Sequence, residues 1–226
     1  MPRGKTFVLE GTDKSGKNTQ SDYLLASIRA LGLNCQKMSF PRYHTPTGRI
    51  VGQCYLGKIL GPGDRAWFGD ANLVPPEVAS IYYAADRLAA VPEIEEILSS
   101  RSHLILDRWV ESNMGHQGGK AKTPEQRAGI IEFISHLEYG VLDLPKPDAV
   151  IFLYMPYEVA RTLPRAEAAD GHESNEEHLR NAEETYLYLA KRFNWKQINC
   201  APNGKIRSID DIHQEVFEIV KPYLSL

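Results

Sequence analysis

Cysteine is scarce in this 226-residue sequence, and its positions show no pairing pattern. No Cys-x-x-Cys motif occurs, and no cysteine lies at metal-ligand spacing from a histidine; the three are Cys35, Cys54 and Cys200. This usage favours reduced thiols and therefore a cytoplasmic protein. A chain of this length can bury enough apolar surface to be stable without disulfides or structural zinc.

Neither sign of charge dominates, and long apolar runs are missing. Lysine and arginine total 26 against 29 aspartates and glutamates, which gives a net charge of -3. This balance excludes a strongly basic nucleic-acid coat, so we expect no nucleic-acid partner. No apolar run reaches the length of a membrane span, and the segment after Met1 has no signal-peptide core, so we also expect no membrane partner.

Short apolar runs alternate with helical patterns along the chain. This alternation is typical of a parallel sheet with helices on both faces and predicts an α/β fold of three layers. We expect a single domain over residues 1–226, with the polar segment 164–175 as a lid. The five expected strands are Thr6–Glu10, Asn34–Ser39, His103–Asp107, Ala149–Tyr154 and Trp195–Asn199.

Capping residues mark several helix ends. The first helix is expected to begin near Lys17 and to stop at Gly32, a suitable left-handed residue. Thr123 and Ser208 are the expected N-caps of two later helices. The inward side of the first helix is expected to carry Leu24, Leu25, Ile28 and Leu31.

The strongest local pattern is Gly-x-x-x-x-Gly-Lys directly after the first strand, in residues 11–17. The two glycines let the backbone curl so that its N–H groups point at phosphate oxygens, and Lys17 reaches the transferred group. The pattern predicts a nucleoside triphosphate site; a plain glycine-rich turn is the less favoured alternative. Asn18 stands where a magnesium-binding Ser or Thr is usual, so its amide oxygen or Thr19 would substitute, or the metal is held elsewhere.

A second acidic position ends the third strand. Asp107 is followed by Arg108, which places a carboxylate within reach of a metal and a guanidinium within reach of phosphate. On its own, this pair is equally consistent with an ion pair at the end of a strand.

The helical stretch from residue 76 carries an apolar stripe, expected to pack inward, with Tyr83 and Arg87 on roughly the opposite side. A ring and a guanidinium one turn apart can stack on a planar base and bind its carbonyl, although a solvated helix face explains them equally well. Residues 40–43, Phe-Pro-Arg-Tyr, follow the second strand at the edge where ligands bind in open α/β sheets. The stripe consists of Val78, Ile81, Tyr82, Ala85, Leu88 and Ala89.

No carboxylate is obviously placed to deprotonate a hydroxyl acceptor. A phosphate monoester, whose second pKa is about 6, is already anionic and needs no base. The sequence therefore favours a phosphate acceptor, aligned with the donor by cations in a site that a lid closes.

Taken together, these motifs resemble those of thymidylate kinases, which are nucleoside monophosphate kinases of the P-loop class. The resemblance covers almost the whole chain. It implies a P-loop NTPase fold, phosphorylation of dTMP to dTDP by ATP with Mg²⁺, and a homodimer. It rests on residues 7–20, 40–43, 84–87, 107–109, 112–113, 144–148 and 170–186.

The resemblance also implies roles in dTMP binding. Tyr83 would stack on thymine, and Arg87 would bond a thymine carbonyl. Arg108 would contact the acceptor phosphate, Asp13 the 3'-hydroxyl region, and Tyr186 would close the deoxyribose side. The other implied substrate neighbours are Phe40, Pro41, Tyr43, Asn113 and Gln117.

On the donor side, the resemblance implies contacts along the P-loop and from the lid, with adenine near residues 200–205. The residues it implies for catalysis are Asp13, Lys14, Lys17, Arg108 and Arg165. Those implied for the ATP phosphates are Gly11, Thr12, Lys14, Ser15, Gly16, Lys17, Asn18, Thr19 and Arg161. The metal candidates are Asn18, Asp107, Asp170 and Glu173.

Two alternatives remain open from the sequence. A kinase for another pyrimidine nucleotide or for a nucleoside would share most of these motifs. A nucleotide-binding regulator with weak activity would share the P-loop, although the sequence has no Asn-Lys-x-Asp motif of a GTPase.

Overall fold

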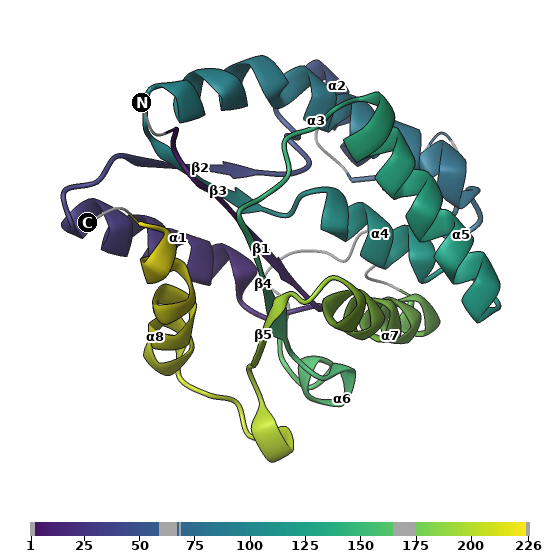
Figure 1. The fold of residues 1–226 in the computed structure, drawn as a ribbon. Coiled ribbons are helices and arrows are strands. Elements are labelled where there is room, and N and C mark those ends of the chain that lie inside the picture. Colours follow the sequence, from purple (N-terminus) through teal and green to yellow (C-terminus); the bar gives the residue numbers. More distant parts are fainter. Residues whose placement is uncertain (1–2, 59–66, 68, 165–174, 225–226) are drawn as a thin grey trace.

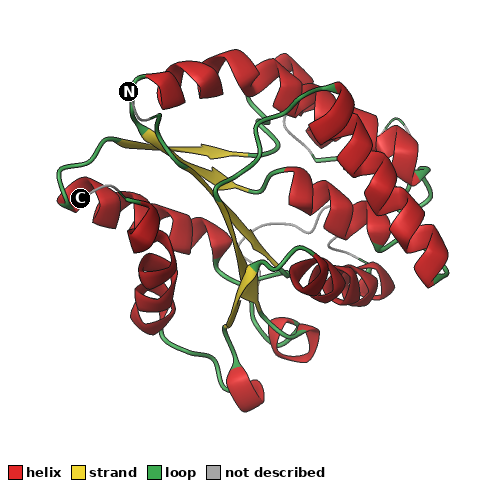
Figure 2. Cartoon of the chain, in the orientation of Figure 1, coloured by secondary structure: helices red, strands yellow, loops and turns green. Residues whose placement is uncertain are grey.

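The computed structural model describes residues 3–58, 67, 69–164 and 175–224. Within these residues, five strands form one parallel sheet in the order β2-β3-β1-β4-β5. Helices cover both of its faces (Figures 1 and 2), which confirms the predicted three-layer α/β fold. The strands are β1 Thr6–Gly11, β2 Cys35–Ser39, β3 His103–Asp107, β4 Ala149–Tyr154 and β5 Lys196–Asn199, each within one residue of its predicted ends.

Eight α-helices occur in the described part of the chain, and π-helical turns follow two of them, α2 and α5. The π-helical turns span Ile50–Tyr55 and His136–Val141. The α-helices are α1 Lys17–Ala30, α2 Pro46–Arg49, α3 Pro76–Ser99, α4 Val110–Gly118, α5 Pro124–Ser135, α6 Tyr157–Ala160, α7 Glu176–Arg192 and α8 Ile209–Val220.

The central strand β1 shows how the sheet separates two cores. Phe7 and Leu9 point to one face and pack with residues of α1 and α8, whereas Val8 points to the other face and packs with α3, α4 and α5. All three side chains are 0% exposed. Because both faces of a parallel strand are buried, β1 reads as a continuous apolar run rather than an alternating one.

The predicted helix ends are confirmed, but one residue predicted to face inward at the end of α1 does not. Gly32 has φ +77° and follows α1, while Thr123 Oγ1 and Ser208 Oγ accept hydrogen bonds from the backbone of the first turns of α5 and α8. Leu24 and Ile28 are buried as expected. Leu31 is 43% exposed, so its inward placement was wrong: it caps the helix rather than continuing the buried face.

The prediction for α3 was wrong about which face packs inward. Val78, Ile81 and Leu88 of the expected inner stripe are 39%, 53% and 41% exposed, whereas Arg87 is buried. The helix is apolar on more than one face, so periodicity alone did not fix its rotation. The buried face carries Ala84, Ala90 and Ile94. Arg87 is also buried, because it pairs with Glu138, which lies far away in the sequence.

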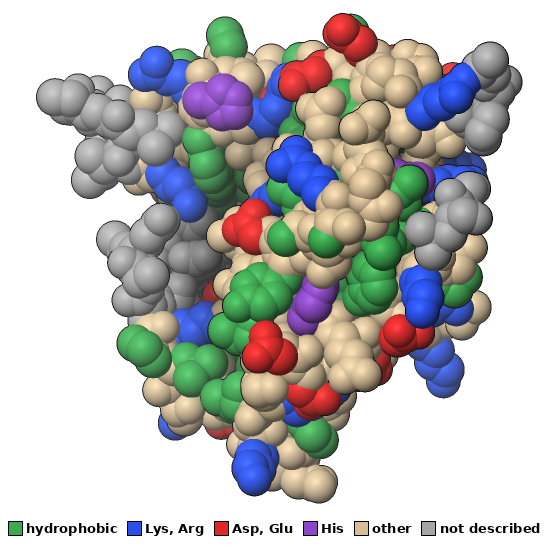
Figure 3. Space-filling view, turned by 90° about the vertical axis from the view of Figure 1, so that its left-hand side faces the viewer, with side chains coloured by type: hydrophobic (Ala, Val, Ile, Leu, Met, Phe, Trp, Pro, Cys, Tyr) green, Lys and Arg blue, Asp and Glu red, His purple; other side chains and the backbone are tan. Residues whose placement is uncertain are grey.

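The surface agrees with the charge balance. On the face that Figure 3 shows, lysines and arginines are interspersed with aspartates and glutamates. Among the described residues, no helix combines the length and apolar character needed to cross a bilayer.

Candidate active site

The predicted motifs meet at one edge of the sheet. Because the strands are parallel, the loops after β1, β2 and β3 leave the sheet on the same side. β3 lies between β1 and β2, so the loop after β3 stands between the other two. This edge therefore brings residues 11–17, 40–43 and 107–108 together.

The loop after β1 is a phosphate cradle. Gly11 must be glycine, because a Cβ there would lie 2.3 Å from Ser15 Oγ and 2.6 Å from the carbonyl oxygen of Leu153. Gly16 has φ +82°, a conformation that favours glycine, and directly precedes α1. The exposed N–H groups at the start of α1 and the helix dipole give this loop an anion-binding end.

Lys17 lies inside the cradle. Its ammonium donates hydrogen bonds to the carbonyl oxygens of Gly11 and Thr12, both at 3.0 Å, and the residue is buried. Burial and, to a smaller extent, repulsion from Arg108 together lower the pKa of Lys17 to about 8, although Asp107 opposes both effects. An anion beside this ammonium would replace the two carbonyl contacts and favour the charged form.

Side chains of the cradle fix it to the rest of the fold. Thr12 Oγ1 donates to the Met155 carbonyl at 2.7 Å and accepts from the Met155 N–H at 2.8 Å. The ammonium of Lys14 donates to the carbonyl oxygens of Ala160, at 3.0 Å, and Leu163. Lys14 therefore ties the cradle to the end of α6 and to the chain that follows it.

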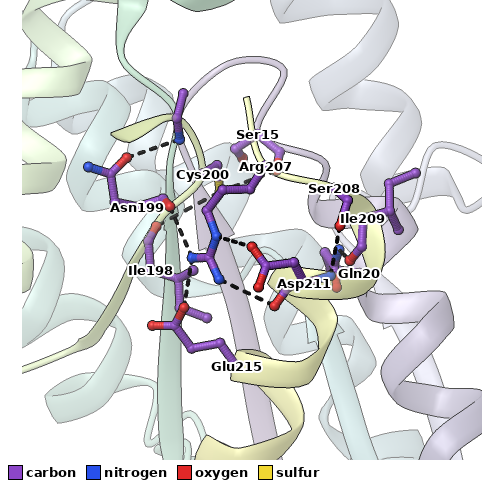
Figure 4. A network of polar contacts seen from close by, with 11 residues as sticks. Ser15, Gln20, Ile198, Asn199, Cys200, Arg207, Ser208, Ile209, Asp211 and Glu215 are labelled. Atoms are coloured by element: carbon purple, nitrogen blue, oxygen red, sulfur yellow. Dashed lines mark hydrogen bonds and ion pairs between the residues drawn. The ribbon is translucent and has the colours of Figure 1, made fainter. Parts of the chain in front are cut away.

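The loop after β5 also contacts the cradle, next to Ser15 (Figure 4). Cys200 Sγ lies 3.9 Å from the Ser15 carbonyl oxygen, and Gln20 Nε2 donates to the Ile209 carbonyl at 2.8 Å. Arg207 holds the loop in place by donating to Asp211 at 2.6 Å and to Glu215 at 2.7 Å. The segment 200–205, predicted to lie near adenine, thus begins beside Ser15, just before the start of α1.

Asp107 and Asn18, both predicted as metal ligands, line the same cavity but have different hydrogen-bond partners. Asp107 has Ser39 Oγ at 3.5 Å as its neighbour. Asn18 Oδ1 accepts a hydrogen bond from the Lys37 ammonium at 2.7 Å, and this ammonium also pairs with Asp22 at 2.6 Å. A carboxylate suits Mg²⁺, whereas an amide oxygen already bound to an ammonium does not.

A cavity of about 470 Å³ extends from Asp107 and Arg108 toward α3 and α4. It gathers most of the residues predicted to bind the acceptor, and Ser39, Leu56, Lys58, Ser112 and His116 complete its wall. The predicted residues along it are Asn18, Phe40, Pro41, Tyr43, Tyr83, Arg87, Asp107, Arg108 and Asn113. Tyr83 and Arg87 thus face a cavity, and the alternative of a solvated helix face is wrong for both.

The far end of this cavity is organised by Glu138, which sequence reasoning missed. Glu138 is 0% exposed and pairs with Arg87 through both carboxylate oxygens, one contact being 2.6 Å. Asn113 Nδ2 donates to the same carboxylate at 2.8 Å. Asn113 Oδ1 is buried and has no hydrogen-bond partner among the described residues, so it is the acceptor that remains for a ligand.

Glu10, a charged residue inside an apolar strand, was a sequence signal that we did not use. Its carboxylate accepts from the Trp109 N–H at 3.0 Å and from Ser112 Oγ at 2.7 Å, which orients the turn that carries Arg108. Burial raises the pKa of Glu10, and the nearby Arg108 guanidinium opposes this. Arg108 itself has φ +69°. The turn is thus held from β1, the neighbouring strand.

Tyr186 and His116 both line a smaller cavity beside Asp13 and Arg108. Tyr186 is 1% exposed and does not line the larger cavity; its hydroxyl lies 3.3 Å from Glu10 and from Ser112. His116 lines both cavities, and its Nε2 lies 3.4 Å from Arg108. His116, two turns after Arg108 and next to the predicted Gln117, was missed.

The remaining predicted residues lie away from the larger cavity or outside the described part. Asp13 lines the smaller cavity, while Gln117 is fully buried, with neither amide atom partnered among the described residues. Thr19 lies in the first turn of α1, and Arg161 pairs with Glu158 at 3.6 Å after α6. Arg165, Asp170 and Glu173 lie outside the described residues, as does the predicted lid, residues 164–175, apart from its first and last residue.

A parallel sheet with a phosphate cradle after its central strand and an arginine-lined cavity beside it defines the P-loop class of phosphate-transferring enzymes. Residues 9–216 match the sequence model of the family described as thymidylate kinase. The chain therefore belongs to the thymidylate kinase family.

Relatives with this name span almost the whole chain. The zebrafish thymidylate kinase is 28% identical over 99% of this chain and 93% of its own length. The Mycobacterium tuberculosis enzyme is 30% identical over 81% and 85%. The thymidylate kinase structure from Candida albicans superposes with a TM-score of 0.73 at 20% identity, covering 98% of this chain and 92% of that one, which shows the shared fold.

Proposed function

We propose that this chain transfers the γ-phosphoryl group of ATP to dTMP, forming dTDP. The observation that carries the proposal is the position of Arg108 between the two halves of the site. It lines the smaller cavity together with Gly11 and Asp13 of the cradle, and it also lines the cavity of about 470 Å³ that contains Tyr83 and Asn113. A donor and an acceptor phosphate would meet at this arginine.

The donor half binds phosphates through backbone N–H groups of residues 11–17 and the start of α1. Lys17 would turn from the carbonyls of Gly11 and Thr12 to the β- and γ-phosphates and neutralise charge that develops during transfer. The cations do not need to donate or accept a proton in this step.

The acceptor half would hold the phosphate of dTMP at Arg108, with its base toward α3 and α4. Tyr83 supplies an aromatic face for stacking, and Asn113 Oδ1 can accept the N3–H of thymine. Arg87 would donate to a thymine carbonyl from a position fixed by Glu138. Because the acceptor is a phosphate dianion near neutral pH, the site needs no general base.

The residues present fit Mg²⁺ at one point. Asp107 would hold the ion directly or through water, and the ion would neutralise phosphate charge. Asn18 is a poor ligand because its oxygen is bound to Lys37. The proposal therefore assigns Mg²⁺ binding to Asp107, while Asn18 forms a structural hydrogen bond with Lys37.

The exposed stripe of α3 supports a homodimer. Val78, Ile81 and Leu88 lie on one side of the helix and are each at least 39% exposed, an arrangement that a second copy of the chain would cover. Sedimentation of the Ile81→Asp variant should show a monomer where the parent chain shows a dimer. A cytoplasmic location is part of the same proposal and agrees with three buried cysteine thiols.

A coupled ADP-release assay with ATP and Mg²⁺ tests the function. The acceptors to compare at equal concentration are dTMP, dUMP, UMP, CMP, AMP, GMP and thymidine, with Lys17→Met as the inactive control. A strong preference for dTMP is expected. Preference for another acceptor would retain the kinase and reject the base pocket, and nucleotide binding without turnover would favour the regulator.

A further inference from the structure

Lys120 lies just after α4, outside the cavity, and has an unusual environment for a lysine near the surface. Its ammonium donates three hydrogen bonds: to Tyr55 Oη at 3.0 Å, to the Ala71 carbonyl at 2.8 Å and to the Val74 carbonyl at 2.9 Å. The three N–H donors of the ammonium thus match three oxygen acceptors. An apolar side chain at this position would leave all three acceptors without this donor.

The location of this ammonium costs free energy. Burial lowers the pKa of Lys120 to about 8, and the Asp70 carboxylate opposes this only in part. The three hydrogen bonds of this ammonium hold Tyr55 and residues 71–74 in one arrangement, which an apolar side chain could not do.

The three acceptors belong to the wall behind the base end of the cavity. Ala71 and Val74 are buried in one cluster with Tyr55 and Leu56, against which Tyr83 packs. The Tyr55 and Tyr83 rings meet edge to face, with centroids 5.7 Å apart. Leu56 and Tyr83 themselves line the cavity. A path of direct contacts therefore runs from Lys120 through Tyr55 to the ring proposed to stack on thymine.

We infer that Lys120 is a positioning residue for the acceptor base: it fastens residues 71–74 to Tyr55 and so fixes the orientation of the Tyr83 ring. This inference rests on the proposed function, because Tyr83 is taken as the stacking partner of thymine. Lys120 touches neither substrate, and its effect is limited to the acceptor side.

Three variants and one control test the inference. Lys120→Met keeps the length of the side chain and removes the donors, and Tyr55→Phe removes the hydroxyl while keeping the ring on Tyr83. The double variant shows whether the two act through one contact. Lys122→Met, an exposed lysine in the same loop, is the matched control.

The expected result is a change confined to the acceptor. Lys120→Met should raise the KM for dTMP about tenfold, the size expected for losing hydrogen bonds from a charged group. The KM for ATP should stay within about twofold, and the double variant should resemble Lys120→Met rather than multiply the two effects. Lys122→Met should match the parent enzyme.

Several results would overturn the inference. A lower melting temperature with equal changes in both KM values would make Lys120 a structural residue only, and an unchanged KM for dTMP would remove its role altogether. If Lys120→Met does not fold, Tyr55→Phe decides, and a KM for dTMP equal to that of the parent rejects the path. Absence of dTMP turnover in the parent enzyme would instead reject the proposed function.

Discussion

Arg87 of α3 and Glu138 of the turn after α5 form an ion pair whose side chains are 2% and 0% exposed. Both nitrogens of one edge of the guanidinium contact the carboxylate, and a third nitrogen donates to the Trp109 carbonyl at 3.3 Å. Arg87 thus joins α3, which carries Tyr83, both to the turn after α5 and to the turn that carries Arg108. It links the stability of the fold to the shape of the acceptor cavity.

Glu138→Gln is expected to lower the free energy of unfolding by about 3 kcal/mol, because it leaves the Arg87 charge buried without a counterion. It should also raise the KM for dTMP more than that for ATP. Urea unfolding and steady-state kinetics measure the two effects. Glu132→Gln is the control, since its pair with Arg192 is exposed and contributes less than about 1 kcal/mol; equal losses in the two variants would contradict the prediction.

The buried carboxyl of Glu111 predicts a pH dependence of stability. Burial raises the pKa of Glu111 to about 7, while its hydrogen bond from Tyr139 Oη at 2.6 Å lowers it in part. In the unfolded chain the group ionises at about 4.3, so between this pH and 7 the unfolded state binds fewer protons and stability falls as pH rises. The loss across this window is about 3 kcal/mol.

Glu111→Gln isolates this contribution, because the amide cannot ionise. Urea unfolding at pH 5 and pH 8 should show a smaller decrease in stability for Glu111→Gln than for the parent chain. Equal decreases would show that Glu111 is ionised throughout.

Arg207 predicts a change confined to the donor side. Its guanidinium joins the loop after β5 to Asp211 and Glu215 of α8, next to the start of α1 (Figure 4). Arg207→Met should loosen this loop and raise the KM for ATP about fivefold, which corresponds to about 1 kcal/mol, with the KM for dTMP unchanged. The exposed Lys205 of the same loop, changed to Met, serves as control; a rise in both KM values would place the loop outside the adenine site.

The ammonium of Lys37 beside Asn18 predicts an altered response to Mg²⁺. Lys37→Met removes a cation near the proposed metal side, so half-maximal rate should need about three- to tenfold less Mg²⁺. Asp22→Asn removes the counterion of Lys37 and should shift the requirement the opposite way. Titration of Mg²⁺ at fixed ATP measures both, and shifts of the same sign would reject an electrostatic role for Lys37.

The strands and the phosphate cradle could be predicted because their signals are local. A buried parallel strand, the glycine spacing and the helix start at Lys17 are read within about a dozen residues, and each was found in the structure. The same holds for the caps at Thr123 and Ser208.

The parts that failed depend on contacts distant in sequence. The rotation of α3 is decided by the contact between Arg87 and Glu138, 51 residues apart, and no periodicity in α3 encodes that partner. Tyr186 lies behind α4 because Gly115 leaves room for its ring: a Cβ at that glycine would lie 2.5 Å from Tyr186 Cζ. His116 lies beside Arg108 and lines both cavities, whereas Tyr186 lines the smaller one.

Because β1 and β3 are adjacent, some properties of the site can change by substitution and others cannot. The cradle follows β1 and Arg108 follows β3, and neighbouring strands are held about 4.8 Å apart by backbone hydrogen bonds that do not depend on side-chain identity. The spacing of these two strands thus sets the distance between the two phosphate sites. Substitutions in the loops do not change that spacing. Acceptor preference can diverge through residues such as Tyr83 and Asn113, while the span that the phosphoryl group crosses stays constant.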